Sequence, residues 1–543
     1  MTLMKNTHNM KLAPKYKNLI SSISSSFIVL SLLFFILHNS SCKKDCNNNQ
    51  QNEHLSNKFV GLCYGPYRVN EDPDFGVNPT INELSEDIGF IKNLTTSIRT
   101  YGVTDGLEQI PLLCQQNGID CFPGAWISKL QCENEKQVNS LIAIANQNLS
   151  HVKGLIVGNE VLLRKDVSEQ QLLDFILRVK DSTNLPVATA ETFSDWLIYP
   201  ELANAVDILF VHIYPYWAGK SINDAPDYIL ESWNEVKKRY PGKTMVLGET
   251  GWPSEGQTIG NAIPGEENQK KYFSDFLTLA KNEEINYFYF EIFDEDWKNK
   301  FEGETGSHWG MYYSNGSIKE HLINLIPIQA NNGFARSARV VIPIITTLPT
   351  YIYKDGCSPE NKFQASGWMG ELADLAGGDS TYFNPFEIID ESCADNPYSA
   401  ETCIRISYTP SVEGKWAGIY WQFPINNWGF YPGYDFSNSI NENDTITLSF
   451  WVRGKNGGEK ANFRTGGINN PNLSYRDSYG PVETGFVTLT SEWEKYSLDL
   501  TGREFNMVIG GFCWVSSFEQ NPNEATIYLD EILIEVTNSK AFK

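Results

Sequence analysis

Two glutamates, each at the end of a short apolar run, are the residues in this chain best suited to act on one bond together. Glu249 ends the run 245–247 and is followed closely by Trp252, while Glu160 closes the apolar segment 152–158. Apolar runs of this length that end in turn formers predict buried parallel strands, with each glutamate where its strand leaves the core. Cleavage of a glycosidic bond needs such a carboxylate pair.

The chemistry of this pair depends on the separation and environment of the two carboxylates. In a retaining mechanism they lie roughly 5–5.5 Å apart, so that one attacks the sugar while the other donates a proton. The proton donor needs a pKa raised by apolar or acidic surroundings, and the flat face of Trp252 offers a platform for a sugar ring. A strand-end glutamate that only pairs with an arginine or lysine is the structural alternative for each residue taken alone, and two matched placements disfavour it.

Alternating strands and helices must position this pair. Eight strand candidates are followed by helical or loop segments, and they lie at 59–65, 97–102, 119–127, 152–158, 186–190, 207–213, 244–248 and 285–293. Eight such units predict a TIM (β/α)8 barrel over residues 58–328, whose carboxyl rim brings the fourth and seventh strand ends face to face. A doubly wound sheet is the competing fold, and the first strand lacks the G-x-G-x-x-G turn of its dinucleotide-binding members.

The sequence after the barrel changes character. Residues 329–350 predict a linker, with the apolar stretch 340–348 as a first strand, and residues 351–543 show short alternating runs separated by turn formers. This pattern predicts an all-β jelly-roll sandwich. Its aromatic residues are dense, so we expect most of them in the core and some in a carbohydrate-binding platform; they include Trp416, Tyr420, Trp421, Trp428, Tyr431, Trp451 and Trp514.

The segments that carry the two glutamates resemble glycoside hydrolase family 17, the β-1,3-glucanases. The segment 248–254 (GETGWPS) resembles the nucleophile signature of that family, and 157–160 (VGNE) resembles its acid/base segment. Weaker similarities in the expected order are 98–102, 213–216, 262–269 and 293–298. The resemblance covers about 59–326 and implies a TIM barrel, retention of anomeric configuration, and β-1,3-glucan as the substrate class.

The resemblance also implies a role for individual residues. Glu160 would be the general acid/base, Glu249 the nucleophile, and Asn159 the ligand of the hydroxyl next to the reacting carbon. Arg99 would help to keep Glu249 ionised. The remaining implied substrate-binding residues are Tyr64, Tyr101, Tyr214, Tyr216 and Trp252, with Glu295 and Lys298 near the acid/base. The last strand of the sandwich resembles galactose-binding-like domains, in which an acidic residue such as Asp530 binds calcium.

Composition narrows the function classes. The chain has 543 residues, of which 41% are hydrophobic, and a formal net charge of −23 without a compensating basic stripe. Nucleic acid is therefore excluded as a partner, whereas a neutral β-glucan fits, and we expect a monomer. No histidine or cysteine spacing indicates a metal, so catalysis is expected to need no cofactor, and His212 is expected to be a satisfied barrel histidine. The alternative functions are a β-1,3-glucan transglycosylase and a non-catalytic glucan-binding surface lipoprotein.

The N-terminus predicts export. Lysines precede the apolar run 27–37, which is shorter than a membrane span, and this predicts a signal peptide over 1–42. Ser40-Ser41-Cys42 resembles a lipobox with Cys42 as the lipidation site, and 43–57 predicts a polar tether. We therefore expect a secreted protein or a cell-envelope lipoprotein that meets a membrane only through its lipid.

Export makes disulfides possible among the 10 cysteines. Cys393 and Cys403 are the expected disulfide, a further pair is expected within Cys114, Cys121 and Cys132, and Cys63 is expected to be a buried thiol.

Overall fold

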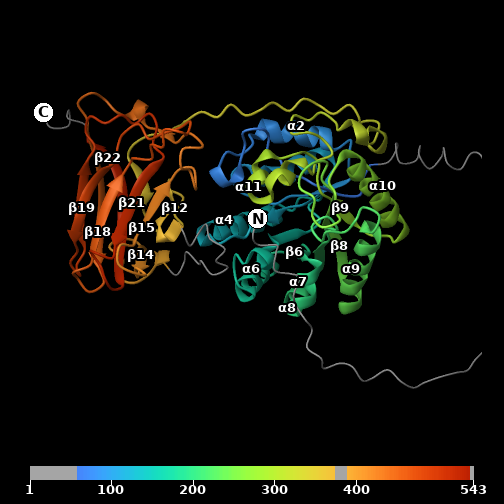
Figure 1. The fold of residues 1–543 in the computed structure, drawn as a ribbon, viewed down its shortest axis with the longest axis horizontal. Helices are drawn as coiled ribbons and strands as arrows, with labels where there is room; N and C mark the ends of the chain where they lie inside the picture. The colour runs from blue at the N-terminus through green and yellow to red at the C-terminus, as the bar shows by residue number, and fades with distance from the viewer. Residues whose placement is uncertain (1–57, 374–387, 538–543) are drawn as a thin grey trace, which may run out of the picture.

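The computed structural model describes residues 58–373 and 388–537, which form a β/α barrel and a β-sandwich side by side (Figure 1). The expected signal peptide, Cys42 and the tether lie outside the described residues. Within the described part of the chain, no helix has the length and apolar character that a membrane span requires.

The barrel strands confirm the expected eight positions, one of which is split. The strands run parallel in the order β3-β2-β1-β9-β8-β7-β6-β5-β4. Their bounds are β1 Leu62–Cys63, β2 Ser97–Arg99, β3 Asp120–Phe122, β4 Gly124–Ala125, β5 Leu155–Asn159, β6 Val187–Thr192, β7 Ile208–His212, β8 Thr244–Thr250 and β9 Tyr287–Tyr289. The third expected strand is divided into β3 and β4 at Pro123, because proline has no N–H to continue the ladder. The two edge strands of the sheet, β3 and β4, are thus separated in sequence by Pro123 alone.

Helices cover the outside of the barrel. They are α2 Ile81–Ile91, α3 Ile110–Asn117, α4 Gln131–Asn146, α5 Val161–Arg164, α6 Glu169–Asp181, α7 Phe193–Ile198, α8 Pro200–Ala205, α9 Ala225–Arg239, α10 Glu266–Asn282 and α11 Asn299–Glu302. The expected capping box at the start of α6 is confirmed, since the Ser168 side chain accepts from the Gln171 N–H and the Gln171 side chain accepts from the Ser168 N–H. Thr80 and Glu83 form a second capping box at α2.

The barrel interior is closed by aromatic side chains. The rings of Phe122, Phe210 and Phe288 lie 5.5–5.7 Å apart, centroid to centroid. Arg99 lies above this layer, with its guanidinium 5.7 Å from the Phe210 ring. Because no polar group of this layer competes for it, Arg99 directs its donors toward the carboxyl ends of the strands.

The C-terminal domain is the expected sandwich of two antiparallel sheets. One sheet contains β13 Ile389–Cys393, β14 Cys403–Tyr408, β22 Ala525–Thr537, β17 Thr445–Gly454 and β20 Glu494–Asp499, with β11 Thr350–Tyr353 paired to β22. The other contains β12 Gln364–Gly370, β15 Trp416–Gln422, β21 Gly510–Ser517, β18 Lys460–Thr465 and β19 Val482–Thr488. Trp421 and Trp514 lie in the core between the sheets, whereas Trp416 is 43% exposed.

The stretch 340–348 was expected to be the first strand of the sandwich, and only Ile344–Ile345 forms one. This strand, β10, is exposed and pairs only with the two residues of β16 Tyr434–Asp435. Pro343 immediately before it removes a ladder donor, and the first longer strand of the domain is β11.

A disulfide joins the sandwich to the barrel. Cys132 at the start of α4 is bonded to Cys357, and beside it the Gln364 side chain donates to Glu133 at 2.6 Å.

The expected Cys393–Cys403 disulfide is wrong: both thiols are free, and the Cys403 S–H donates to the carbonyl of Cys393. The two cysteines are directly paired across β13 and β14, and sequence proximity alone did not reveal this geometry. The other cysteines of the expected cluster, Cys114 and Cys121, are free too, as is Cys63, which is buried as expected.

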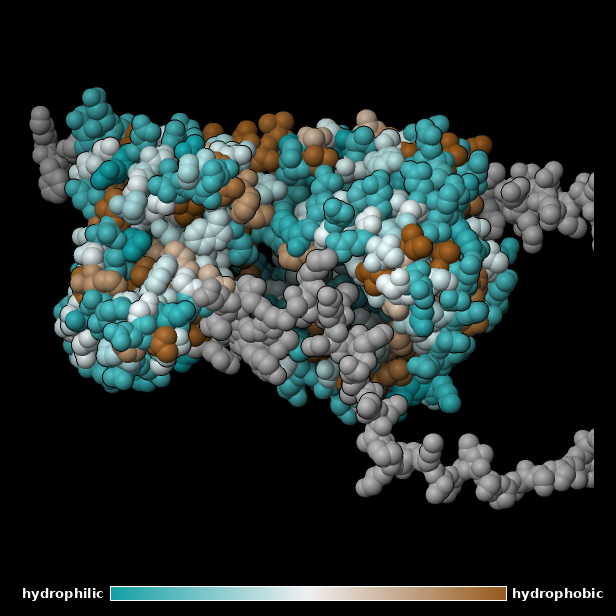
Figure 2. Space-filling model, in the orientation of Figure 1, coloured by the Kyte–Doolittle hydropathy of each residue, from teal (hydrophilic) through white to brown (hydrophobic). Residues whose placement is uncertain are grey.

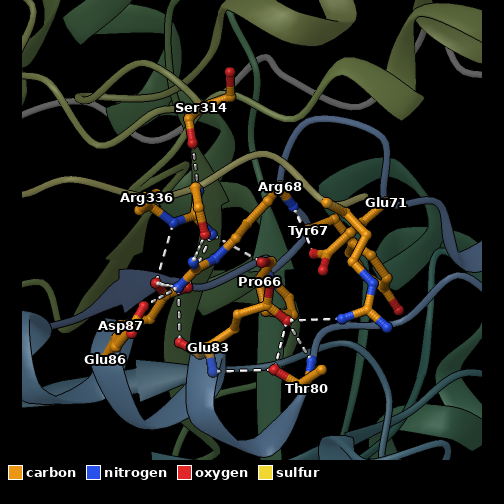
Figure 3. A network of polar contacts seen from close by, with 12 residues as sticks. Pro66, Tyr67, Arg68, Glu71, Thr80, Glu83, Glu86, Asp87, Ser314 and Arg336 are labelled. Carbon is orange, nitrogen blue, oxygen red and sulfur yellow. Dashed lines mark hydrogen bonds and ion pairs between the residues drawn. The ribbon is translucent and has the colours of Figure 1, made fainter. Parts of the chain in front are cut away.

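The segment between the domains lies against the barrel and is anchored there. Arg336 is buried and donates to both oxygens of Asp87 on α2, at 3.1 and 2.8 Å (Figure 3). Arg68, in the loop after β1, donates to the same carboxylate at 2.9 Å. We call Arg68, Asp87 and Arg336 the linker-anchor cluster; it ties the connecting segment to a loop on the carboxyl side of the barrel.

Candidate active site

The structure brings the two predicted carboxylates together at the carboxyl rim. Glu249 lies on β8, and Glu160 follows β5 directly. An oxygen of Glu160 and an oxygen of Glu249 lie within 4.8 Å of each other. Inverting enzymes need about 6.5–9.5 Å between their carboxyl groups to admit water, so this spacing matches the retaining geometry. Glu160 has a φ of 51°, a left-handed conformation that non-glycine residues adopt mainly where the surrounding structure requires it.

Glu249 is buried and held by three side-chain donors. The hydroxyl of Tyr101 donates to its Oε1 at 2.8 Å, and the hydroxyl of Tyr214 donates to its Oε2 at 2.9 Å. The guanidinium of Arg99 lies 3.2 Å from Oε1. Donors and positive charge stabilise the ionised form of a carboxylate, so the surroundings of Glu249 suit a nucleophile. The predicted pairing of Arg99 with Glu249 is present in the structure.

His212 is a neighbour of both predicted catalytic glutamates that the sequence did not reveal. It lies buried at the end of β7, with its Nδ1 2.8 Å from Glu160 Oε1 and 3.5 Å from Glu249 Oε2. Its Nε2 lies 2.8 Å from Arg99 Nη1. His212 is hydrogen-bonded, as expected of a buried barrel histidine, but its partners include the two predicted catalytic glutamates. We call Arg99, Glu160, His212 and Glu249 the catalytic cluster.

The electrostatic surroundings of Glu160 act in opposite directions. Burial raises its pKa, while the hydrogen bond and charge of His212, together with Arg164 and Arg99, lower it, and the net pKa lies below the usual value.

Glu191, on β6, is a carboxyl that no motif in the sequence indicated. Burial, together with the charges of Asp195 and Glu160, holds the pKa of Glu191 well above its usual range. Glu191 also accepts from the N–H of Val161, so it fixes the residue that follows Glu160. Its place at a strand end was the signal that could have found it.

Asn159 and the tyrosines that touch Glu249 are the predicted substrate-binding residues that reach the open side. Asn159, Tyr101 and Tyr214 are all partly exposed. Asn159 is held in place because its Oδ1 accepts from Arg99 Nη2 at 2.7 Å. Its amide N–H₂ is therefore the end that can face a sugar hydroxyl.

Three of the aromatics predicted to bind substrate, Trp252, Tyr64 and Tyr216, are fully buried, which contradicts direct contact with a sugar. Trp252 is 0% exposed, donates its indole N–H to the carbonyl of Ile263, and packs against the rings of Tyr216 and Tyr272. Tyr64 donates its hydroxyl to Asp87, and Tyr216 donates to the carbonyl of Gln257. Motif positions specify the strand end, whereas the direction of each ring depends on loops packed against it.

Glu295 and Lys298 form a buried ion-pair group beside the site rather than a sugar-binding pair. Lys298 contacts Glu295 at 2.7 Å and also Glu291. Its ammonium lies 4.4 Å from the centre of the Phe290 ring, which packs against the ring of Tyr214 at 5.9 Å. The group thus reaches Glu249 through packed aromatic rings. Gly65 is required beside it, since a Cβ there would lie 2.1 Å from Glu295 Oε2.

A further carboxyl, Glu302 on α11, lies in the field of the catalytic pair. Burial, with the charges of Glu249 and Glu160, raises its pKa to about 7, although Lys298 and a hydrogen bond from Trp309 lower it. The Trp309 indole N–H donates to Glu302 Oε2 at 2.7 Å. No motif in the sequence indicated this residue, because it comes from a loop after β9.

Metal ligation was tested against the described residues. Glu160, His212 and Glu249 are the one group there whose ligand atoms lie close enough to share an ion. Arg99 already supplies positive charge to His212 and Glu249, so we assign no ion to them. Asp530, the expected calcium ligand, accepts from the N–H groups of Tyr398, Ser399 and Glu531. Donors that point at both of its oxygens do not fit a calcium site.

A β/α barrel with two carboxylates this close at its carboxyl rim is the arrangement of retaining glycoside hydrolases. Comparison with known proteins agrees. Residues 61–310 match the model of the BtgE/BtgC glycoside hydrolase domain. The glycoside hydrolase family 17 β-1,3-glucanosyltransferase of Rhizomucor miehei is 31% identical, and the match covers 48% of this chain and 96% of that enzyme, with a TM-score of 0.43. This chain belongs to glycoside hydrolase family 17.

Two further relatives delimit the match. The probable glucan endo-1,3-beta-glucosidase btgC of Aspergillus terreus is 26% identical over 303 residues, which are 50% of this chain and 46% of that protein. The endo-laminarinase of Formosa is 21% identical, covering 53% of this chain and 93% of that enzyme, with a TM-score of 0.45. The chain therefore spans just under half the length of the curated relative, and the shared part is the barrel.

Proposed function

We propose that this protein hydrolyses β-1,3-glucan with retention of configuration, through a covalent glycosyl-enzyme. The observation that carries the proposal is the separation of at most 4.8 Å between an oxygen of Glu160 and an oxygen of Glu249. That distance is shorter than the roughly 6.5–9.5 Å between the carboxyl groups of inverting enzymes, which supports direct attack of one carboxylate on the sugar. The names of the family relatives support β-1,3-glucan as the substrate.

In the first half-reaction, an oxygen of Glu249 attacks the anomeric carbon while the bond to the leaving oxygen breaks. Glu160 gives its proton to that oxygen, so the leaving chain departs as an alcohol. Tyr101, Tyr214 and Arg99 hold the Glu249 carboxylate in place beforehand. In the second half-reaction, Glu160 removes a proton from water, whose oxygen displaces Glu249.

The test is product analysis with laminarin and two alanine variants. The parent should release reducing ends, and Glu249→Ala and Glu160→Ala should both lose turnover. With an aryl laminaribioside and azide, Glu160→Ala should give a glycosyl azide of retained configuration and Glu249→Ala one of inverted configuration. Glu235→Gln on the exposed face of α9 is the control and should behave as the parent. The same stereochemistry in both alanine variants would refute the assigned roles.

Transglycosylation is the second candidate, since the Rhizomucor miehei relative is a β-1,3-glucanosyltransferase. The two activities differ only in whether water or a glucan hydroxyl displaces Glu249. Products longer than the substrate at high oligosaccharide concentration would establish a transferase. Binding of laminarin without release of reducing ends would instead support a non-catalytic glucan-binding protein.

The sandwich is proposed to hold glucan for the barrel, and its attachment supports this. Phe75, in the loop after β1, packs on Tyr431 of the sandwich at 4.6 Å between centroids, and Cys132 follows the loop after β4. Loops after barrel strands lie at the carboxyl rim, so the sandwich flanks the face that holds the catalytic pair. Figure 2 shows the surface hollowed between the two domains in this view. Phe430, 54% exposed beside Phe75, and Trp416, 43% exposed, are two of its accessible aromatics. Alanine at both should weaken pull-down on insoluble β-1,3-glucan while turnover of short oligosaccharides is kept.

We also propose that the chain is exported, with Cys42 as the lipid attachment site. The order of charged, apolar and small residues in 1–42 supports it. Cys42→Ser should move the protein from the membrane fraction to the soluble exported fraction and should abolish labelling by a fatty acid. Unchanged fractionation would leave a simple secretory signal.

A further inference from the structure

His212 presents one N–H to two carboxylates that must be in different protonation states. The direction of its hydrogen bonds follows from Arg99. A guanidinium has only donors, so His212 Nε2, 2.8 Å from Arg99 Nη1, must be the acceptor. We therefore assign the ring proton to Nδ1, and the Nδ1–H donates to Glu160 Oε1 at 2.8 Å.

The two carboxylates depend on this donor to different degrees. Glu249 has the hydroxyls of Tyr101 and Tyr214 and the guanidinium of Arg99, while its distance to His212 Nδ1 is 3.5 Å. For Glu160, His212 is the one side-chain hydrogen-bond donor among the described residues, although Arg164 and Arg99 add positive charge nearby. Removal of the Nδ1–H therefore changes the state of Glu160 far more than that of Glu249.

We propose that His212 is a positioning residue whose Nδ1–H holds the Glu160 carboxylate in the ionised form that activates water in the second half-reaction. The inference rests on the proposed function. In that step Glu160 takes a proton from water, the water oxygen bonds to the anomeric carbon, and the bond from that carbon to Glu249 breaks, which returns Glu249 as a carboxylate. A donor on Glu160 favours the form that accepts the proton and disfavours the acid form needed in the first step.

The charged groups that face the His212 imidazole come from several strands. Arg99 faces it from β2, Glu160 from the end of β5 and Glu249 from β8, while Thr192 is its sheet neighbour on β6. Glu191 and Arg164 lie close enough to Glu160 to interact with its charge. Of these groups, Arg99 determines the tautomer of the imidazole, and Glu160 accepts the hydrogen bond from its Nδ1–H.

Asparagine and glutamine form a matched pair of substitutions for the test. The amide N–H₂ of asparagine can take the place of Nδ1–H and donate to Glu160, but asparagine is too short to reach Arg99. The amide oxygen of glutamine can take the place of Nε2 and accept from Arg99, but it leaves no donor near Glu160. His212→Asn therefore keeps the proposed function of the ring, and His212→Gln removes it.

The experiment measures both variants with dinitrophenyl β-laminaribioside, whose leaving group needs no acid, so that the second half-reaction limits turnover. His212→Gln should lower kcat about tenfold or more with a burst of dinitrophenol, and His212→Asn should show a clearly smaller loss without the burst. On laminarin, the basic limb of the kcat/KM profile should move up by on the order of one pH unit in His212→Gln only. Equal losses in both variants, or an unmoved basic limb in His212→Gln, would overturn the proposal.

A spectroscopic measurement keeps the proposal testable if a variant does not fold. Nitrogen NMR of the protein with labelled histidine should show one of its seven histidines as a neutral ring protonated at Nδ1. That signal should move when a glycosyl-enzyme is trapped on Glu249 with a fluorinated glucoside. An Nε2-protonated ring would refute the inference directly. A parent without glucanase activity would refute the proposed function, and the tautomer would still decide the inference.

Discussion

The barrel contains two buried arginine–carboxylate clusters that are built on opposite principles. In the linker-anchor cluster, one carboxylate receives two guanidinium groups, since Asp87 accepts from Arg68 and from Arg336 (Figure 3). The hydroxyl of Tyr64 adds a fourth hydrogen bond to the three from these arginines. In the catalytic cluster, two carboxylates flank one imidazole, and the single guanidinium contacts one of them, Glu249.

The difference lies in which charge is in excess. Each oxygen of Asp87 accepts two hydrogen bonds, so the contacts of this carboxylate are saturated. Glu160 and Glu249 compete for His212, and Glu160 keeps its side chain 23% exposed against 6% for Glu249. A cluster short of donors can exchange a proton with a ligand, whereas a saturated one can only hold its elements together.

The largest expected effect is on activity and not on stability. Glu249→Gln should lower turnover of laminarin by on the order of 10⁴-fold, because an amide oxygen is too weak a nucleophile to form the glycosyl-enzyme. The free energy of unfolding should stay within about 1 kcal/mol of the parent, since the loss of charge for Arg99 is offset by relief of repulsion with Glu160. Reducing-sugar release and urea denaturation measure the two. A large loss of stability would mean that the catalytic cluster also holds the barrel together.

The catalytic pair and the barrel were predictable because strand ends and their order are local properties. The run 245–247 ahead of Glu249, and the position of Glu160 after 152–158, determined the strands on which both lie. Side-chain contacts across the barrel were not predictable in this way. Trp252 belongs to the same motif as Glu249, yet its ring is buried against Tyr272 of α10. His212 contacts Glu160 because the ends of β5 and β7 lie close together in the barrel.

The sandwich shows the same limit. Its alternating runs predicted strands, but the disulfide joins Cys132 to Cys357, 225 positions apart, while the neighbours Cys393 and Cys403 stay reduced. Loop closure over such a distance depends on how the domains pack, which no local pattern encodes. The linker-anchor cluster was missed for this reason too, since Arg336 meets Asp87 across most of the barrel sequence.

The next largest effect should come from the linker-anchor cluster, and it should be on stability alone. Asp87→Ala leaves Arg68 and Arg336 buried without their shared carboxylate, which should cost about 3–5 kcal/mol. Turnover per folded molecule should stay within about twofold, because Asp87 touches none of the catalytic cluster. Urea denaturation and active-site titration measure the two. Glu86→Ala, whose side chain is 58% exposed, is the matched control and should cost under about 1 kcal/mol.

The free energy of unfolding should depend on pH through Glu71, which accepts from the backbone of Arg68 beside the linker-anchor cluster. Burial raises the pKa of Glu71 to about 7, against the hydrogen bond from the Arg68 N–H. Between about pH 4.5 and pH 7 the folded protein keeps a proton that the unfolded chain has released, so stability falls as pH rises through this window. Glu71→Gln should remove that fall and exceed the parent by up to about 3 kcal/mol above pH 7. Parallel curves for parent and variant across this window would show that Glu71 ionises normally.

The smallest expected effect is at the capping box that borders the linker-anchor cluster. Thr80→Ala removes the acceptor of the Glu83 N–H at the start of α2 and should cost about 1 kcal/mol. Ser168→Ala removes the equivalent group at the exposed start of α6 and provides the comparison. Arg68 also donates to the carbonyl of Glu83, so the two substitutions distinguish a local cap from one coupled to the cluster. Equal losses in urea denaturation mean that the cap acts alone, and a clearly larger loss for Thr80→Ala means that the ion pairs of the cluster depend on the first turn of α2.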